Sequence, residues 1–419
     1  MKTKFGIVGM GSMGKGLLHQ SLANGPECVT ISDIDIQKCV NIAQDFNILF
    51  EVTHDWQQTK KCIEAGMLAI QSNCTNVAEC EYIDVFVEAS SSVVDGGFYA
   101  KTALERKKHL VLMNSEVDLI FGPHLVRLAD RQKCTYTSCD GDQHGVIKRL
   151  LDEITLWGFR PIMAGNIKGF LDRYANPTTI VPEADKRDLS YKMCTAYTDG
   201  TKLNIEMALV ANATGMLPTQ IGMTGARFNH VNEILDKLPL HEKLNCVDYI
   251  LGAEPGGGVF VIGYNSDSYK RYMMNYFKMG NGPYYVFYRP YHLCHIEAMQ
   301  CILDAAGGCN DIYKSLLRPE SMKTNVFAFA KKDLAKGERL DGIGGYTCYG
   351  MIDTNKGDEN ENRLPICLAE NVVLKRDIPK NSSIMIHDIE MPASWEREKH
   401  LTCNSYDPWR MYMMALKGL

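Results

Sequence analysis

The sequence has no CxxC pair, no block of basic residues and no long apolar run. Its 15 cysteines are scattered from Cys28 to Cys403, so neither a zinc ribbon nor a thioredoxin-type motif is predicted, and we expect reduced thiols in a cytoplasmic protein. The 45 Lys and Arg residues against 50 Asp and Glu leave a net charge of -5, which disfavours nucleic acid and anionic membranes as partners. No stretch approaches the ~18 apolar residues of a membrane span, and no signal-peptide core follows the N-terminus.

What is present is a globular pattern. Hydrophobic residues make up 45% and charged residues 23% of the 419 positions, values that exclude wholesale disorder. Strand and helix signals alternate over residues 1–140, which predicts βαβ units and a parallel sheet. The stretch 51–80 fits this alternation least well, and we expect an irregular insertion there.

A glycine loop opens the chain. Gly9, Gly11 and Gly14 form GxGxxG directly after the strand-like KFGIVG, and Asp33 follows 19 residues after Gly14, at the end of a second strand. The first glycine makes the tight turn, the second lets backbone approach a pyrophosphate, and the third lets helix pack on strand. We therefore predict a dinucleotide site formed by this loop, with Ser12 and Met13 inside it.

Acidic residues favour NAD over NADP at this site. Asp33 can accept hydrogen bonds from both ribose hydroxyls, and Asp35 adds a negative charge where a 2′-phosphate would lie. Lys38, one turn into the next helix, keeps NADP open as the alternative. Ser90 in EASS and Asn114 in NSE follow two later strands, so we expect both in the crevice that takes the nicotinamide half.

A charged triad stands on a helix that is otherwise apolar. Asp199, Lys202 and Glu206 recur at i, i+3 and i+7 around the predicted helix 200–213, a spacing that puts them on one face. A lysine between two carboxylates would stay protonated and could steady a developing oxyanion. An internal salt-bridge cluster is the alternative. Lys168, after the predicted strand 162–167, is a further charged candidate.

A second cluster combines cations with aromatic rings and suits a phosphate or carboxylate on a substrate. The alternative is an aromatic core segment with exposed charges, and the run HLCHIE also offers two histidines and a glutamate as metal ligands. The members of the cluster are Tyr288, Arg289, Tyr291, His292 and His295, with Lys278 upstream.

The segments GDQHG (141–145), YTDGTKLNIEMALVANATG (197–215) and KMGNGPYYVFYRPYHLCHIE (278–297) resemble the homoserine dehydrogenase-like oxidoreductases that carry a C-terminal SAF domain. That group includes the 1-deoxy-D-xylulose 5-phosphate reductoisomerase-like enzymes of some bacteria. The resemblance implies that Asp199, Lys202 and Glu206 line the active site, with Asn212 near the substrate. His144 departs from the aliphatic or proline residue that many relatives have after GDQ.

The expected architecture is α/β with three parts. A Rossmann domain (1–140) is followed by a central α+β catalytic domain (141–328) and a β-rich module (329–395), which the resemblance identifies as a SAF or β-clip module; residues 396–419 form a tail. Within the module, FAKKDLAKGERL (329–340) resembles VLKRDIPKNSSI (373–384), a weak internal repeat.

Two functions follow as hypotheses. The first is an NAD(P)-dependent reductase or reductoisomerase of a small hydroxy-ketone, expected to be phosphorylated, in which Lys202 or a divalent metal steadies the intermediate. The second is a simple dehydrogenase of a sugar alcohol, a sugar acid or a homoserine-like substrate. A cofactor-sensing binding protein is the non-enzymatic alternative. We expect a homo-oligomer acting on a small molecule.

Overall fold

The computed structural model describes residues 2–23, 25–187, 189–307, 316–355, 362–392 and 407–419. The chain forms two compact units, one of Met1–Gly145, Leu293–Glu320 and Arg410–Leu419 and the other of Val146–His292 and Ser321–Trp409. The predicted α/β class with an N-terminal Rossmann-like sheet is confirmed. The domain boundaries predicted from the sequence stay predictions, because the chain passes repeatedly between the two units.

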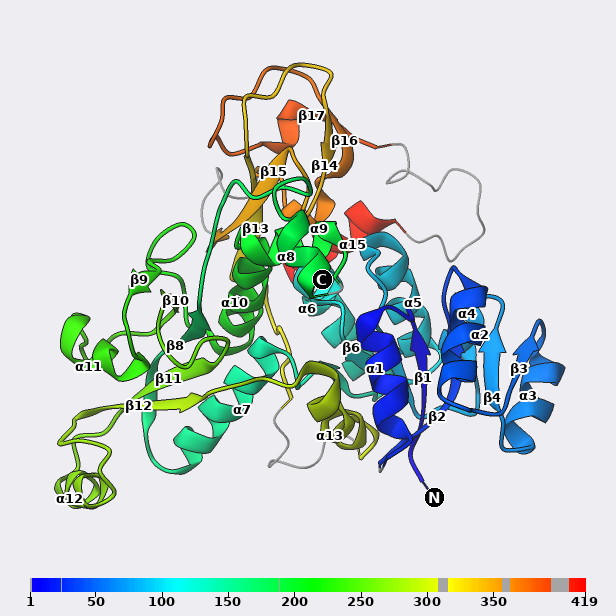
Figure 1. Ribbon diagram of the computed structural model, residues 1–419, viewed down its shortest axis with the longest axis horizontal. Helices are drawn as coiled ribbons and strands as arrows, with labels where there is room; N and C mark the ends of the chain where they lie inside the picture. Colours follow the sequence, from blue (N-terminus) through cyan, green and yellow to red (C-terminus); the bar gives the residue numbers. More distant parts are fainter. Residues whose placement is uncertain (1, 24, 188, 308–315, 356–361, 393–406) are drawn as a thin grey trace. The chain divides into compact units, whose positions relative to one another are not determined.

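The first unit is built on a parallel seven-stranded sheet in the order β3-β4-β2-β1-β5-β6-β7. Figure 1 shows β3 and α3 at one edge of this sheet. The apolar strands are buried on both faces, as parallel strands covered by helices require. Their bounds are β1 Lys4–Val8, β2 Glu27–Ser32, β3 Phe50–Thr53, β4 Leu68–Gln71, β5 Val85–Glu88, β6 His109–Leu112 and β7 Tyr136–Ser138.

Helices cover both faces of this sheet. On one face α1 packs against α13, and Phe5 and Ile7 of β1 lie under them in the core. On the other face α5 packs against α6. The helices of this unit are α1 Ser12–Ser21, α2 Ile36–Asp45, α3 Trp56–Glu64, α4 Cys74–Glu79, α5 Val93–Glu105, α6 Ser115–Gln132, α13 Cys294–Ala306 and most of α15 Pro408–Lys417; α7, Gln143–Leu156, begins here and continues into the second unit. None of the described helices is long and apolar enough to cross a membrane.

The expected irregular insertion at 51–80 is wrong. This stretch contains most of β3, then α3, β4 and α4, and it continues the parallel sheet without interruption. The strand signal is weak because β4 has only four residues. The helix signal is weak because α3 is strongly polar and buries only Thr59, Cys62 and Ile63.

The second unit has a mixed five-stranded sheet in the order β12-β11-β8-β10-β9. Antiparallel and parallel neighbours flank the central strand β8, and the buried helix α10 packs near this sheet. The elements are β8 Arg160–Lys168, α8 Val181–Lys186, α9 Tyr191–Thr198, α10 Thr201–Thr214, β9 Ala226–Arg227, α11 Ile234–Lys237, β10 Cys246–Leu251, β11 Val259–Tyr264, α12 Ser268–Tyr276 and β12 Tyr284–Arg289.

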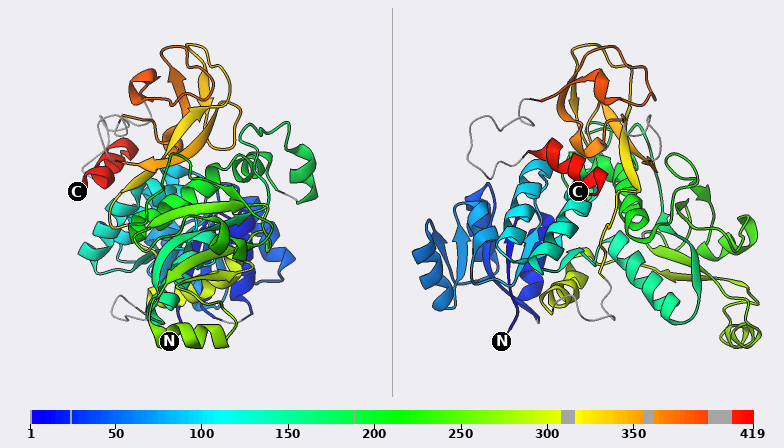
Figure 2. Two further views of the ribbon diagram at one scale, coloured as in Figure 1. Left: turned by 90° about the vertical axis from the view of Figure 1, so that its left-hand side faces the viewer. Right: turned by 180° about the vertical axis from the view of Figure 1, so that it is seen from behind.

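A β-rich region completes this unit, as the sequence predicts for residues after 329 (Figure 2). Its strands form a pair, β13–β15, and a three-stranded sheet, β14-β16-β17. The bounds are β13 Thr324–Ala330, β14 Arg339–Asp341, β15 Cys348–Thr354, β16 Glu370–Leu374 and β17 Ile389–Glu390.

The internal repeat is visible as a reciprocal set of hydrogen bonds. The backbone groups of Leu334 and Ile378 exchange two bonds of 2.9 Å, and these residues occupy equivalent places in the two copies. The Asp333 carboxylate accepts from Lys380 N (2.8 Å), while the Asp377 carboxylate accepts from Lys336 N (2.7 Å). Each copy of the repeat therefore caps the turn of the other copy, and the two copies are joined by equivalent hydrogen bonds.

Because the two caps are equivalent, removing either should have the same effect. We expect Asp333→Ala and Asp377→Ala each to lower the free energy of unfolding by about 0.5–1.5 kcal/mol, the usual contribution of one hydrogen bond. Asp236→Ala, at an exposed position of α11, is the matched control. Urea unfolding of the three variants measures the effect, and a loss at only one of the two caps would contradict the symmetry.

Candidate active site

The glycine loop adopts the conformation that a dinucleotide site requires. Gly9, directly after β1, has φ +94°, and a Cβ there would lie 2.4 Å from Ser90 N. A Cβ on Gly14 would lie 2.0 Å from the carbonyl oxygen of Gly9. Both positions therefore exclude any side chain, one for the turn and the other for the close packing of α1 on the loop.

Gly11 differs from the other two glycines. A Cβ built on Gly11 would meet no protein atom within 4 Å, so protein packing does not explain the glycine. Gly11 is the N-cap of α1 and provides no side-chain cap to the helix, while Ser12 is exposed and Met13 packs against the core. Space at Gly11 beside an uncapped helix start fits a pyrophosphate, which such a terminus attracts.

Asp33 lies directly after β2 and contacts the glycine loop. Its Oδ2 accepts from Met10 N at 2.6 Å, and its side chain keeps 11% of its surface exposed. Lys38 Nζ lies 3.7 Å from the same oxygen. Asp35 instead caps α2 by accepting from Lys38 N at 3.2 Å. The carboxylate available to a ribose is thus that of Asp33, with one cation beside it.

Ser90 and Asn114 lie at the carboxyl ends of β5 and β6, where the sequence predicts them. The Asn114 side chain caps α6 and donates to the carbonyl oxygens of Ser90 (2.8 Å) and Ser92 (3.2 Å). The amide of Asn114 therefore ties two loops of the crevice together. Ser90 N donates to Glu88 Oε1 at 2.9 Å, so a side chain at the end of β5 also fixes this loop.

Glu88 is an unusual residue at the end of β5. Its side chain is fully buried, no described residue forms an ion pair with it, and burial raises its pKa to about 8. Glu116 acts in the same direction through its negative charge, while hydrogen bonds from Ser90 and Asn114 oppose the shift. The raised pKa favours the protonated form of Glu88 well below pH 8, and its side chain supports the loop that carries Ser90.

In the second unit, α10 carries two charged residues in a buried setting. Lys202 and Glu206, separated by four residues on the same helical face, are 6% and 3% exposed. Asn166 Nδ2 of β8 donates to Glu206 Oε2 at 3.1 Å. Sequence reasoning missed Asn166, because a polar residue inside a predicted strand gives no signal of what it faces.

Asp199 does not belong to the triad on this face. Gly200, with φ +84°, separates α9 from α10, so Asp199 stands before the helix and the i, i+3, i+7 rule does not apply to it. Its carboxylate accepts from Thr201 N and pairs with Lys331 Nζ at 2.8 Å, and both side chains are buried. Burial raises the pKa of Asp199, and the Lys331 ammonium opposes this shift.

Lys331 also donates to the carbonyl oxygens of Ala175 (2.7 Å) and Gly345 (2.8 Å). The ammonium thus bonds to two carbonyl oxygens and forms an ion pair with Asp199, and these three partners lie in three separate segments. The partner of Asp199 therefore comes from the end of β13 in the β-rich region. In the sequence, Lys331 is one of two adjacent lysines. The one signal that distinguishes it is its position directly after an apolar strand, which favours burial of the first lysine.

Strand register brings the other predicted cations to the face of α10. Arg289 pairs with Val259, and Val259 pairs with Asn166, in adjacent strands. Directly paired residues point to the same side of a sheet, and so do residues two apart in one strand. Arg289 and Lys168 therefore share the face on which Asn166 meets Glu206. This face combines three cations, from Lys168, Lys202 and Arg289, with one carboxylate.

The end of β12 positions His292 near this face. His292 Nδ1 lies 2.9 Å from the carbonyl oxygen of Gly257, in the turn before β11. Tyr288 points to the opposite face of the sheet, where its ring lies 6.3 Å from that of His230. The predicted cluster therefore divides, with Arg289 on the α10 side.

Two predicted residues lie elsewhere. Lys278 follows α12, beyond the far end of β12 from Arg289, a separation of about 17 Å along that strand alone. His295 packs its ring against Gly16 of α1, within the first unit. Lys278 and Arg289 are close together in the chain, but the length of β12 separates them in space.

The side chain of Asn212 ties α10 to the first residue of β13. It exchanges hydrogen bonds with the backbone of Thr324, donating to the carbonyl oxygen (3.1 Å) and accepting from the N–H (2.8 Å). Thr201 Oγ1 and Asn204 Oδ1 accept from Gly350 N and Ile352 N, each at 2.9 Å. The polar side of α10 is thus bonded along its length to β13 and β15, and the predicted substrate contact of Asn212 is not supported.

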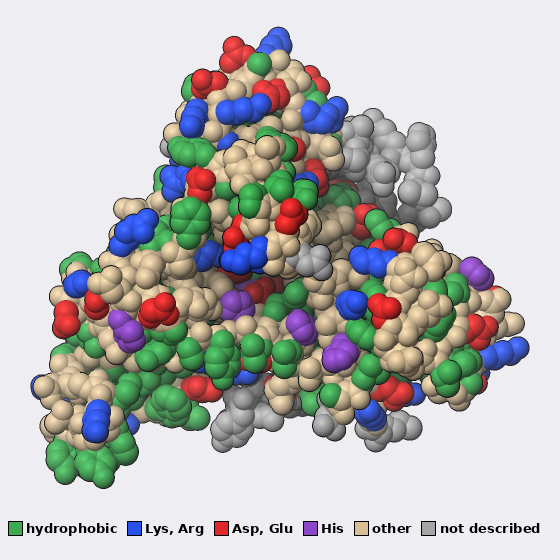
Figure 3. Space-filling view, in the orientation of Figure 1, with side chains coloured by type: hydrophobic (Ala, Val, Ile, Leu, Met, Phe, Trp, Pro, Cys, Tyr) green, Lys and Arg blue, Asp and Glu red, His purple; other side chains and the backbone are tan. Residues whose placement is uncertain are grey.

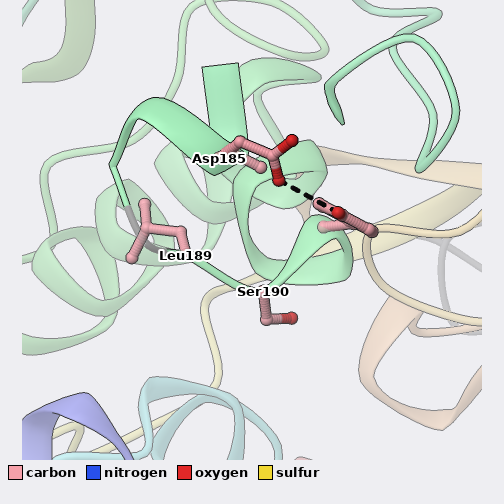
Figure 4. Close-up of a pocket in the computed structure, with 5 residues that line it drawn as sticks. Asp185, Leu189 and Ser190 are labelled. Carbon is pink, nitrogen blue, oxygen red and sulfur yellow. Dashed lines mark hydrogen bonds between the residues drawn. The ribbon is translucent and has the colours of Figure 1, made fainter. Parts of the chain in front are cut away.

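Hollows border the described elements at the start of α10 and around α8 and α9. One, of ≈ 230 Å³, borders the start of α10, with Arg173, Asp199, Asn204 and Tyr249 among its lining residues. The other, of ≈ 360 Å³, lies between α8 and α9, where Asp185 accepts a bond of 2.9 Å from Tyr191 (Figure 4). The second contains none of the predicted site residues. In the described part of the chain, no group of three or more His, Cys, Asp or Glu residues could hold a metal ion.

Comparison with known families gives one assignment. Residues 141–298 match the family model described as "Oxidoreductase DRL, catalytic domain". No curated protein matches the chain. Solved structures with similarity include a probable dehydrogenase from Thermotoga maritima (12% identity, 63% of this chain and 73% of that chain, TM-score 0.38).

A scyllo-inositol dehydrogenase from Lactobacillus casei is also similar (14% identity, 63% and 74%, TM-score 0.37), as is a DOX-P reductoisomerase in complex with magnesium (13% identity, 73% and 79%, TM-score 0.37). Similarities at this level carry no functional argument. The family match covers the segment that contains β8, α10 and β12. With the dinucleotide loop of the first unit, it defines the chain as an NAD(P)-dependent oxidoreductase.

Two glycine variants separate folding from cofactor binding. We expect Gly11→Ala to leave the melting temperature unchanged, because the new Cβ meets no protein atom. It should weaken dinucleotide binding at least tenfold, about 1.4 kcal/mol, because the methyl group occupies the space beside the helix start. Gly14→Ala should lower both the melting temperature and the affinity for the dinucleotide, since its Cβ would collide with Gly9 O. Gly169→Ala, also in open space, is the control, and undiminished affinity in Gly11→Ala would contradict the assignment.

The raised pKa of Glu88 predicts a pH dependence of stability. Between the ordinary pKa of 4.5 and about 8, the folded state binds a proton that the unfolded state has lost. Stability therefore falls as pH rises through this window, by at most about 1.4 kcal/mol per pH unit. Glu88→Gln keeps the shape without the titration. We expect the melting temperature of the variant, relative to wild type, to rise between about pH 5 and about pH 8. A difference that stays constant with pH would contradict the raised pKa of Glu88.

Proposed function

We propose that this oxidoreductase transfers hydride between NAD and a small, phosphorylated hydroxy-ketone or its alcohol. The observation that carries the proposal is the face that combines the buried Lys202 and Glu206 of α10 with the half-buried Lys168 and Arg289. Three cations in a partly desolvated setting suit a substrate with an anionic group and an oxygen that becomes negative during the reaction. The match of this segment to an oxidoreductase catalytic domain supports the same reaction class.

In this proposal each cation has a different task. Lys202 on α10 is the most buried of the three and stabilises the oxyanion that forms when a carbonyl accepts hydride, or donates its proton to that oxygen. Arg289, with its planar guanidinium, holds the phosphate or carboxylate of the substrate. Glu206 keeps the lysine charged and oriented.

Residues at the carboxyl edge of the first sheet would hold the dinucleotide, which would supply hydride when bound. Gly9, Gly11 and Gly14 would hold the pyrophosphate, Asp33 the adenosine ribose, and the loop with Ser90 the nicotinamide half. The β-rich region is proposed as a SAF module, on its internal repeat and on the resemblance of the whole chain to SAF-containing oxidoreductases. Its role in the proposal is to hold α10.

Reductoisomerisation and simple dehydrogenation are the two versions of the reaction. The first would rearrange the carbon skeleton through an enediolate-like intermediate, whose negative charge Lys202 would stabilise; a bound divalent metal would supply the same positive charge. The second acts on a sugar alcohol, sugar acid or homoserine-like substrate and needs no rearrangement. Turnover of candidate substrates with and without EDTA distinguishes them, because only the first is expected to depend on a metal.

Lys202→Met tests the catalytic assignment. We expect turnover to fall by roughly 10²–10³-fold, the range for removing one oxyanion donor, while the dissociation constant of the cofactor stays unchanged. The melting temperature should also fall, because the buried Glu206 loses the neighbouring ammonium, although Asp199 retains its own partner, Lys331. Lys336→Met, at an exposed turn, is the control. A Lys202→Met enzyme with full activity would overturn the role.

Cofactor preference is tested by calorimetric titration with NAD and NADP. We expect tighter binding of NAD, because the Asp33 carboxylate would repel a 2′-phosphate. Lys38, 3.7 Å from that carboxylate, limits the size of the preference. Asp33→Asn should shift the ratio towards NADP, whereas a tenfold preference of the wild type for NADP would contradict the assignment.

A further inference from the structure

Helix α12 presents a row of exposed tyrosines. Tyr269, Tyr272 and Tyr276 recur at i, i+3 and i+7, which aligns them on one side of the helix, and they are 70%, 68% and 69% exposed. Met274, on the side towards the rest of the unit, is only 9% exposed. Figure 1 shows α12 at the far end of the excursion between β11 and β12, and Figure 3 shows hydrophobic side chains gathered on it.

A fourth aromatic ring extends the row. Phe277, the C-cap of α12, is 62% exposed, and its ring centroid lies 5.2 Å from that of Tyr276. Single exposed hydrophobic side chains are ordinary on protein surfaces. Four neighbouring aromatic side chains on one element form a patch of the kind that marks an interaction site.

The cations of α12 are already engaged within the chain. Lys270 Nζ donates to the carbonyl oxygen of Trp157 at 2.9 Å, and Arg271 Nε donates to that of Asn281 at 3.0 Å. These bonds fix the helix on the unit that carries it, so the tyrosine row is presented rigidly. They also turn the charges of both residues towards backbone acceptors, which disfavours an anionic lipid surface as the partner, because such helices use their cations on lipid headgroups.

The exposed area of the row would supply a large part of one side of a specific interface. At roughly 150–250 Å² for each whole aromatic side chain, the four rings expose about 500 Å². A standard interface needs about 800 Å² per partner, so these rings would supply more than half of it. Leu156 and Trp157, at the end of α7, are 75% and 48% exposed, and the Lys270 bond ties this segment to α12.

We propose that the tyrosine row of α12 docks on the same row of a second copy of this chain. A twofold interface brings a surface against itself and therefore requires one without like charges at its centre, and an uncharged tyrosine row meets that condition. Tyrosine is also enriched in protein interfaces. The docking gives a homodimer in which the two α12 helices pack against each other through Tyr272.

Sedimentation velocity at low and high micromolar concentration tests the proposal. The wild type is expected as a dimer of the 47.0 kDa chain. Tyr272→Lys brings two like charges together at the twofold axis and should weaken dimerisation at least tenfold, about 1.4 kcal/mol. Leu49→Lys, at a position 76% exposed in the first unit, is the matched control and should remain dimeric. Leu49→Lys should keep the wild-type melting temperature, whereas Tyr272→Lys should remain folded with a melting temperature lowered only by the loss of its partner.

Three outcomes would overturn the proposal. A wild-type protein that is monomeric at all concentrations has no such interface. A Tyr272→Lys protein that dimerises as tightly as wild type uses another surface. A monomeric wild type that floats with phosphatidylserine vesicles, where Tyr272→Lys does not, would assign the row to a membrane surface instead.

Discussion

The buried ion pair between Asp199 and Lys331 is the constraint on which the second unit depends. Removing two charges from water is costly unless the charges are close together and form further hydrogen bonds; here Nζ and Oδ2 are 2.8 Å apart and both side chains form further bonds. Asp199 also accepts from the first residue of α10, and the Lys331 ammonium bonds to two carbonyl oxygens besides the carboxylate. The start of the helix that bears Lys202 is therefore fixed by a residue from the β-rich region.

The same helix is fixed along its length by polar side chains. The side chains of Thr201, Asn204 and Asn212 accept hydrogen bonds from backbone N–H groups of β13 and β15. A helix that is apolar on its remaining sides and buried can then keep Lys202 and Glu206 on one defined face. The β-rich region thus has a direct structural relation to the proposed chemistry, which explains why a module after the catalytic segment belongs to the same unit.

Sequence reasoning reached the features that depend on local spacing. The glycine loop, the second strand and Asp33 are close in the chain, and the structure gives Gly9 and Gly14 the contacts that such a loop demands. The repeat within the β-rich region was also recognisable, because equivalent residues, such as Asp333 and Asp377, occupy equivalent turns.

Residue spacing predicts the wrong neighbours where one residue changes the course of the backbone or where strands from distant segments pair. Gly200 interrupts what looks like one helix, so Asp199 leaves the face of Lys202 and finds a partner 132 positions away, at Lys331. Arg289 and Lys168 share a face only because three strands pair in one register, which no local pattern reveals. Lys278 was grouped with Arg289 by chain proximity, although a whole strand lies between them.

Hydrogen–deuterium exchange of α10 tests the central claim that the β-rich region fixes this helix. In Lys331→Met, Asp199 loses its partner, and amides at the start of α10 should exchange at least tenfold faster, equivalent to about 1.4 kcal/mol. Helix α1 in the first unit should exchange as in wild type. Lys332→Met, which removes the neighbouring exposed lysine, should change neither helix. Unchanged protection of α10 in Lys331→Met would contradict the account.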